Sequence, residues 1–82
     1  MTIDMRISEI AEYRLTYRLE EIPLHRGASY AIAVRIESDD RAEDTVVHDV
    51  CRNRAEAETL FHVIVKGLVT PCTLMDVLED LL

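Results

Sequence analysis

The sequence has no tryptophan and only three tyrosines and one phenylalanine, so aliphatic side chains must supply most of its core. Its two cysteines, Cys51 and Cys72, are too few for a disulfide framework. No basic start followed by an apolar stretch marks a secretory signal. The longest apolar-rich run, residues 60–69, is too short to span a bilayer. These absences favour a reducing, cytoplasmic location and no membrane partner.

Positive charge is also scarce. Nine basic residues stand against 16 acidic ones, for a net charge of −7. An acidic chain repels phosphate groups, so we expect neither nucleic acid nor an anionic membrane surface as a partner. The length of 82 residues allows one domain, residues 1–82, with a thin core that self-association would help to stabilise.

Alternation of apolar and polar residues predicts three strands. Residues 13–20 and 29–37 alternate clearly, whereas residues 45–51 do so less regularly. The predicted buried faces consist of Tyr13, Leu15, Tyr17 and Leu19 and of Tyr30, Ile32, Val34 and Ile36. In the third strand one face is expected to carry Val46, His48 and Val50, and the other Val47, Asp49 and Cys51. Residues 1–10 have no clean period and are either a frayed terminus or a short extra strand.

The connections follow from composition. Pro23 and Gly27 indicate a loop over residues 21–28, and the polar residues 38–44 indicate a turn. Short connections between successive strands favour an antiparallel meander.

The period then changes to that of a helix. Asn53 is a good N-cap with Glu56 three residues later, and Gly67 suits the end of this first helix. Thr70 and Pro71 begin a second helix. The apolar stripes are Ala57, Leu60, Phe61, Ile64 and Leu68, then Leu74, Val77, Leu78 and Leu81. The sequence therefore predicts an α+β fold of order β-β-β-α-α, a three-stranded antiparallel meander with two C-terminal helices on one face.

Few residues could support metal or nucleophilic chemistry. His48 and Cys51 are three apart, but a strand does not direct such positions to one side, and no second ligand pair is close. His62 is expected in solvent on the first helix, and His25 lies in a loop. Cys72 at a helix start could have a lowered thiol pKa, yet the sequence places no base beside it. We predict no catalytic, cofactor or metal residue; the alternative is a small thiol-dependent enzyme or ligand-binder that uses Cys72.

Two surfaces could instead bind protein. The polar sides of the first two predicted strands should form a sheet face that the helices leave open, and small alanines between arginines would let another surface approach. The second helix carries acidic residues near its C-terminal end, where the helix dipole disfavours them. The candidate residues are Arg14, Thr16, Arg18, Ala31, Ala33 and Arg35 on the sheet and Asp76, Glu79 and Asp80 on the helix. Each set could equally be ordinary solvent-facing surface, but together they favour a non-enzymatic domain that binds itself, as a homodimer, or a protein partner.

The C-terminal half carries a motif of the form T/S-P-x-x-L-x-D-V-x-E-D. It is made by Thr70, Pro71, Leu74, Asp76, Val77, Glu79 and Asp80. With "SYAIAV" and "HDV", this motif resembles an uncharacterised small-protein family of Gram-positive anaerobes, domain of unknown function family 6514, over about residues 13–82. The resemblance implies a β-rich N-terminal half followed by helix, and it implies no activity, cofactor or catalytic residue.

Overall fold

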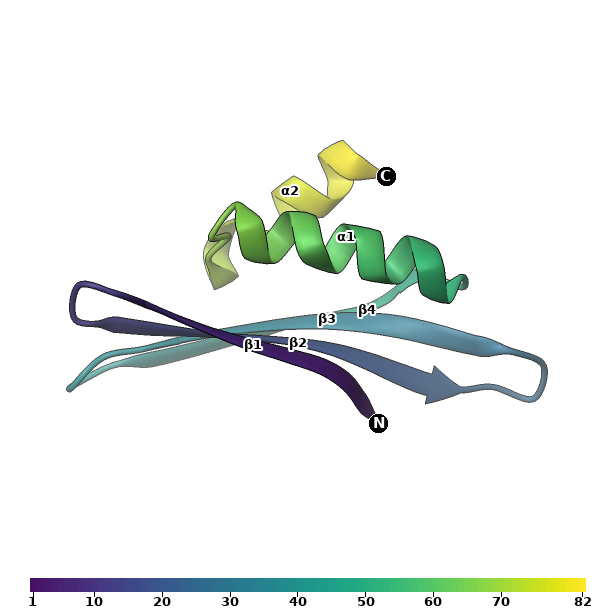
Figure 1. Ribbon diagram of the computed structural model, residues 1–82, viewed down its shortest axis with the longest axis horizontal. Helices are drawn as coiled ribbons and strands as arrows, with labels where there is room; N and C mark the ends of the chain where they lie inside the picture. Colours follow the sequence, from purple (N-terminus) through teal and green to yellow (C-terminus); the bar gives the residue numbers. More distant parts are fainter.

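The computed structural model describes all 82 residues and has an α+β fold. Four antiparallel strands are followed by helix α1, a short 3-10 turn η1 and helix α2. They comprise β1 Thr2–Ile10, β2 Tyr13–Pro23, β3 Ala28–Glu37, β4 Ala42–Cys51, α1 Arg54–Lys66, η1 Pro71–Thr73 and α2 Leu74–Leu81. The strands pair in sequence order, and both helices lie on the same side of the twisted sheet (Figure 1). The other side of the sheet is bare, as the sequence predicts.

The prediction of three strands was wrong, because residues 2–10 form a fourth. β1 pairs antiparallel with β2, and Met5 lies opposite Arg18 and Ile7 opposite Thr16. Its period of two is present in the sequence, since Ile3, Met5 and Ile7 alternate with Asp4, Arg6 and Ser8. The apolar residues Met5 and Ile7, however, lie on the bare side of the sheet. β1 therefore lacks the fully buried face that identifies the inner strands.

The strands are also longer than predicted and their connections shorter. β2 continues to Pro23, which pairs with Ala28, and β4 begins at Ala42. Of the two predicted connections, only residues 24–27 and 38–41 remain as turns. Pro23 is tolerated because it ends its strand. Gly27 has a φ of 82°, a left-handed conformation that glycine adopts without steric cost.

β4 contains an irregularity that overturns one predicted face. The register with β3 shifts between Tyr30 and Ile32, and Asp49 has a φ of 54°. Between these positions β4 advances four residues while β3 advances two, so the bulge adds two residues to β4. Val50 is consequently buried in the core, whereas His48 is exposed, so the two do not share a face.

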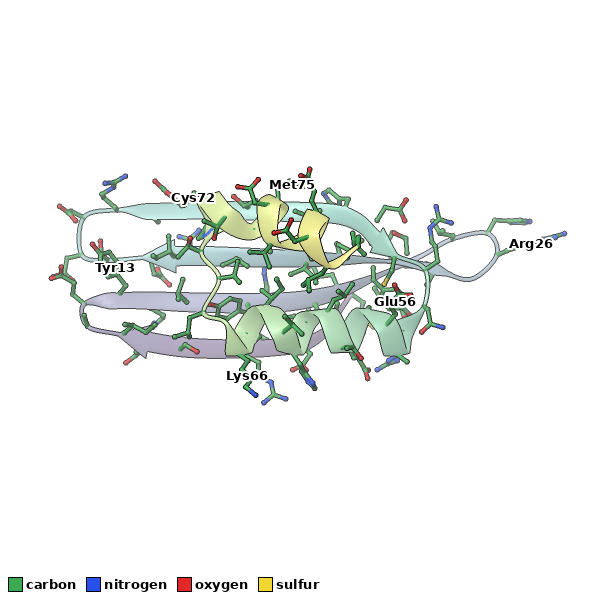
Figure 2. All side chains as sticks on the ribbon, turned by 90° about the horizontal axis from the view of Figure 1, so that it is seen from above. Tyr13, Arg26, Glu56, Lys66, Cys72 and Met75 are labelled. Carbon is green, nitrogen blue, oxygen red and sulfur yellow. The ribbon has the colours of Figure 1, made fainter.

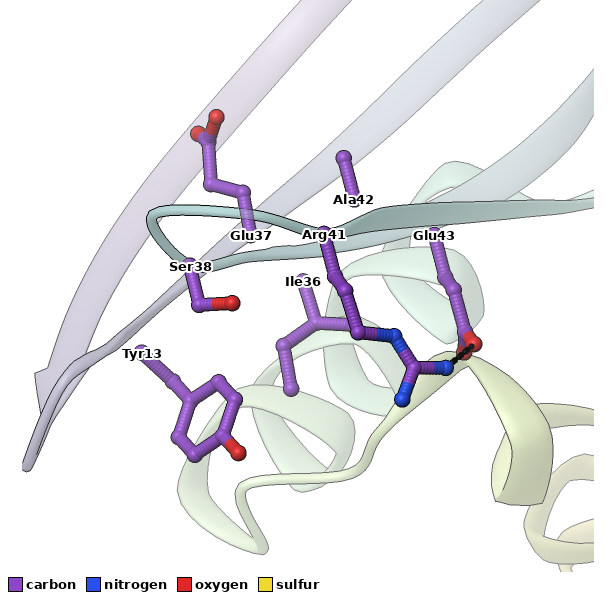
Figure 3. A pocket seen from close by; sticks show the side chains of 7 residues that line it. All are labelled: Tyr13, Ile36, Glu37, Ser38, Arg41, Ala42 and Glu43. Atoms are coloured by element: carbon purple, nitrogen blue, oxygen red, sulfur yellow. Dashed lines mark hydrogen bonds and ion pairs between the residues drawn. The ribbon is translucent and has the colours of Figure 1, made fainter.

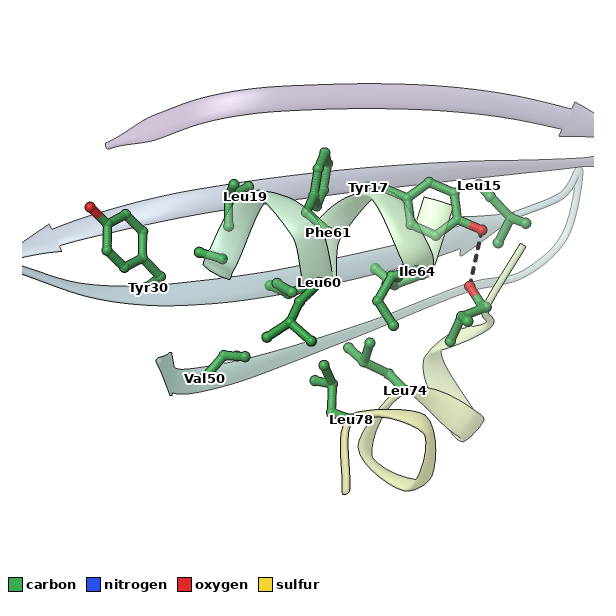
Figure 4. Packing of buried hydrophobic residues seen from close by; sticks show 14 residues of the cluster. Leu15, Tyr17, Leu19, Tyr30, Val50, Leu60, Phe61, Ile64, Leu74 and Leu78 are labelled. Atoms are coloured by element: carbon green, nitrogen blue, oxygen red, sulfur yellow. Dashed lines mark hydrogen bonds between the residues drawn. The ribbon is translucent and has the colours of Figure 1, made fainter. Parts of the chain in front are cut away.

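The core fills the space between the sheet and the two helices (Figure 4). Tyr17 and Leu19 from β2, Ile32 and Val34 from β3, and Phe61 from α1 are among its fully buried side chains. From α2, Leu74 and Leu78 are buried, whereas Leu81, which the predicted stripe includes, is 43% exposed. The last helix thus closes the core with two leucines.

One buried hydrogen bond joins the sheet to the helical layer. The Tyr17 hydroxyl donates to the carbonyl of Val69 at 3.0 Å, across 52 residues of sequence (Figure 4). Both residues are buried, so without this bond the carbonyl would lose its solvent partner and gain none. Burial also raises the pKa of the Tyr17 hydroxyl, which keeps it protonated as a donor.

The start of α1 is as predicted, and its end differs in detail. Asn53 is the N-cap, and its side-chain oxygen accepts a hydrogen bond from the Glu56 N–H at 3.0 Å. At the other end Gly67 keeps a right-handed conformation, and Leu68 takes the left-handed one with a φ of 53°. Leu68 is therefore 43% exposed and does not extend the buried stripe.

The chain after α1 forms a Schellman motif. The Leu68 N–H donates to the Val65 carbonyl and the Val69 N–H to the Ile64 carbonyl, at 3.1 and 3.3 Å. The predicted second helix is then divided. Thr70 is the N-cap of the 3-10 turn Pro71–Thr73, and α2 begins only at Leu74.

Replacing Leu78 by alanine should lower the free energy of unfolding by about 2–4 kcal/mol, because it leaves a cavity at a side chain only 1% exposed. Urea denaturation followed by circular dichroism would measure the loss. The matched control is Leu81→Ala on the same helix, which should cost less than about 1 kcal/mol. Equal losses in the two variants would show that Leu78 does not close the core.

Replacing Tyr17 by phenylalanine should cost about 1–2 kcal/mol, because the Val69 carbonyl stays buried without a donor. Tyr13→Phe, at a half-exposed tyrosine of the same strand, is the control and should be nearly neutral. The raised pKa of Tyr17 adds a pH dependence. The folded state holds this proton more tightly than the unfolded state, so wild type should lose stability relative to Tyr17→Phe as the pH rises past about 10. A constant difference through that range would contradict this account of the bond.

Candidate functional site

The open face of the sheet is the side turned away from the helices. Residues directly opposite each other in an antiparallel pair share a face, so the register defines its rows. One row runs Ile7, Thr16, Arg35, Asp44, and the next runs Met5, Arg18, Ala33, Val46. All six sheet residues predicted as an interaction surface belong to this side. We define the open face by Met5, Ile7, Glu9, Arg14, Thr16, Arg18, Glu20, Ala31, Ala33, Arg35, Glu37, Asp44 and Val46.

Three of these are exposed apolar residues that the sequence reasoning did not include. Met5 is 54% exposed, Ile7 55% and Val46 37%. Met5 and Val46 are at the two ends of one row, on the two edge strands. Between them Ala33 is almost fully covered, at 1% exposure. The row therefore presents exposed apolar surface at its two edges.

The arginines of the open face are all paired with carboxylates. Arg14 binds Glu9 across the β1–β2 pair at 3.0 Å, and Arg18 lies 3.9 Å from Glu20. Arg35 lies 3.9 Å from Glu37 and 3.7 Å from Asp44. Three arginines thus face four carboxylates, which leaves this side close to electrically balanced in a chain of net charge −7.

The acidic residues of α2 form a separate surface. Asp76, Glu79 and Asp80 are exposed, and none makes an ion pair within the chain. α2 lies on the opposite side of the sheet from the open face (Figure 1), so the two candidate surfaces cannot act as one contact.

The cysteines and histidines do not gather. Cys72 is exposed, and its sulfur contacts the Thr70 hydroxyl at 3.4 Å, a group that is not a base. Cys51 is half-buried, and its thiol donates to the Asn53 carbonyl at 3.4 Å. Burial raises the pKa of the Cys51 thiol. No three His, Cys, Asp or Glu side chains are grouped so that they could hold a metal ion.

One perturbed carboxylate lies at the β4 bulge. Arg52 donates to Asp49 at 2.7 Å, and this hydrogen bond is the main reason that the pKa of Asp49 is lowered. The pair fixes the chain between β4 and α1, in an exposed position. The ion pair with Arg52 at the bulge therefore explains the lowered pKa of Asp49.

An open cavity of about 220 Å³ lies at the end of the sheet that carries the β3–β4 turn (Figure 3). Tyr13 and Ile36 supply its apolar surface, and Arg41 lies across from them. The Arg41 guanidinium is already bound to Glu43 at 3.1 Å. No histidine or cysteine lines the cavity, and none of the predicted candidate residues does.

The structure defines the protein as a small α+β domain with a four-stranded antiparallel sheet covered on one face by two C-terminal helices. The chain belongs to a family of unknown function, DUF6514, whose match extends over residues 2–82. No curated protein and no solved structure matches the chain. Neither helix is long and apolar enough to cross a membrane.

The two thiols should react at different rates. Cys72 is exposed and should react with Ellman's reagent at least about tenfold faster than Cys51, whose thiolate is disfavoured by burial. Because the pKa of Cys51 is raised, its rate should still increase with pH above the range of an ordinary thiol. The variants Cys51→Ser and Cys72→Ser, each with one remaining thiol, allow the two rates to be measured separately. A faster reaction at Cys51 would contradict the burial of its sulfur.

Proposed function

We propose that this chain is a non-enzymatic protein-interaction domain whose binding surface is the open face of its sheet. The observation that carries the proposal is the exposure of Met5, Ile7 and Val46 on a side that no part of the chain covers. Met5 and Ile7 adjoin on the same face of β1, and exposed apolar patches are typical of surfaces that bind other proteins.

The charges of the open face favour a protein as the bound species. Its arginines and carboxylates alternate and nearly cancel, so they do not repel an acidic protein as the whole chain would. Interleaved charges of both signs contribute specificity and register in protein interfaces. The stems of Arg18 and Arg35, both partly buried, add flat apolar area beside Ala33.

Association with a partner would also stabilise the folded domain. Only 18 of its 82 residues are buried, which makes a thin core. A chain of this size with a core of this kind is stabilised by association. The bound protein is a second copy or a protein partner in the cell. The alternative of a thiol-dependent enzyme or ligand-binder at Cys72 has no comparable support, since only a hydroxyl contacts that sulfur.

Reversing one charge on the open face should weaken binding. In Arg18→Glu the new carboxylate would stand beside Glu20, so we expect association to weaken at least tenfold, by about 1.4 kcal/mol or more. Sedimentation over a concentration series would measure self-association, and capture from an extract of the source organism would identify a partner. Arg26→Glu is the matched control. It makes the same change in net charge on the β2–β3 turn, away from the open face.

The proposal fails if wild type is monomeric at every concentration and wild type, Arg18→Glu and Arg26→Glu all capture the same proteins. Circular dichroism of each variant would verify that the sheet is intact.

A further inference from the structure

The outer edge of β1 is one of the two unpaired backbone edges that border the open face. β1 is the first strand in the order of the sheet, and no element lies outside it (Figure 2). It is nine residues long, and its backbone groups on that side have no strand to bond. Such an edge can accept another strand in the same sheet.

The charges of β1 are complementary to those of a second β1. Asp4 and Arg6 are two residues apart, so they point to the same side of the strand, the side that the helices cover. If two antiparallel copies meet with Met5 opposite Met5, each Asp4 lies opposite the Arg6 of the other copy. Opposite charges in directly facing positions stabilise a strand pair, and like charges destabilise it.

The same charges discriminate against neighbouring registers. Only shifts of two residues keep the helices of both copies on one side of the sheet. A shift in one direction puts Arg6 opposite Arg6, and a shift in the other puts Asp4 opposite Asp4. The register centred on Met5 is thus the one in which both charges find a partner.

The surroundings of Arg6 add to this preference. Arg6, His62, Val65 and Lys66 line a shallow groove between β1 and α1. Within the chain the Arg6 guanidinium contacts only Asp4, at 3.2 Å. A second strand would bring another Asp4 to this basic groove and form an alternating ladder of four charges.

The opposite edge of the sheet is less suited to pairing. β4 carries the consecutive acids Glu43 and Asp44 near its start, and its backbone leaves the extended conformation at Asp49. Bulges of this kind interrupt edge pairing. β1 has a register shift as well, between Thr2 and Asp4, but it lies at the start of the strand and leaves residues 4–10 in regular register with β2.

We propose that two copies of this chain associate through β1, antiparallel and centred on Met5, to form one continuous eight-stranded sheet. This goes beyond the proposed function, because the second copy binds at the edge of the sheet and not on its open face. Pairing at the edge leaves the open faces uncovered and joins them into one surface, with Met5 and Ile7 of both copies at its centre.

The first test uses charge reversal. Asp4→Arg and Arg6→Asp should each raise the dimer dissociation constant at least tenfold in sedimentation experiments. By symmetry, each change creates two pairs of like charges that face each other across the dimer. The double variant Asp4→Arg/Arg6→Asp should restore association to near the wild-type constant. Failure of the double variant to recover, with its fold intact by circular dichroism, would overturn the proposal.

The second test uses cross-linking and keeps the wild-type charges. In a Cys51→Ser/Cys72→Ser background, Met5→Cys should form a disulfide-linked dimer under mild oxidation, and Ile7→Cys should not. Only the residue on the two-fold axis meets its own counterpart, so preferential linkage at position 7 would overturn the register.

The outcomes separate this proposal from the general one. A dimer that is lost in Arg18→Glu but is unaffected by Asp4→Arg is a face-to-face dimer, which overturns the edge pairing and leaves the proposed function standing. A wild-type protein that stays monomeric overturns the edge pairing as well, while partner capture still tests the open face.

Discussion

The hydrogen bond from Tyr17 to the carbonyl of Val69 is the constraint on which the arrangement of the helices depends. It ties the middle of β2 to the short segment between α1 and η1. Without that anchor nothing polar would fix where the segment crosses the sheet. With it, Pro71, Leu74 and Leu78 lie over the part of the core that α1 leaves uncovered. The strained Leu68, held left-handed next to Val69, belongs to the same turn.

A layer of helices on one side gives the sheet two chemically different faces. The covered face of β2 and β3 is built from large apolar residues, and the open face mixes arginines, carboxylates and small side chains. The charge is divided in the same way. The open face is nearly balanced, so most of the excess of acid lies elsewhere, including the three carboxylates of α2. This separation allows a strongly acidic chain to present a surface that another acidic protein can approach.

Sequence reasoning could predict the inner strands and α1 because each has its own pattern. β2 and β3 bury one face completely, which forces a strict alternation, and Asn53 begins α1 by a local hydrogen bond. β1 could not be distinguished from a frayed terminus, because its alternation does not mark a buried side. Its polar residues Asp4 and Arg6 lie on the helix side, whereas Met5 and Ile7 lie on the open face.

Other features depend on backbone conformations that the residue types do not specify. The left-handed φ of Asp49 turned Val50 into the core, and that of Leu68 came one residue after the glycine that could have adopted it most easily. The candidate surface could also be predicted only in part. Alternation placed Arg14, Arg18 and Arg35 together correctly, whereas Met5 and Ile7 could join them only once the pairing of β1 was known.

The meander also determines the order in which the fold can form. Every strand pairs with its neighbour in sequence, so the sheet is assembled from local hairpins, which close at low entropic cost. The contact between Tyr17 and Val69 spans 52 residues and must come late. During synthesis the strands leave the ribosome before α1 and α2 do. The apolar side of the nascent sheet therefore stays exposed to solvent until α2 has left the ribosome. The chain is most prone to aggregation during this interval.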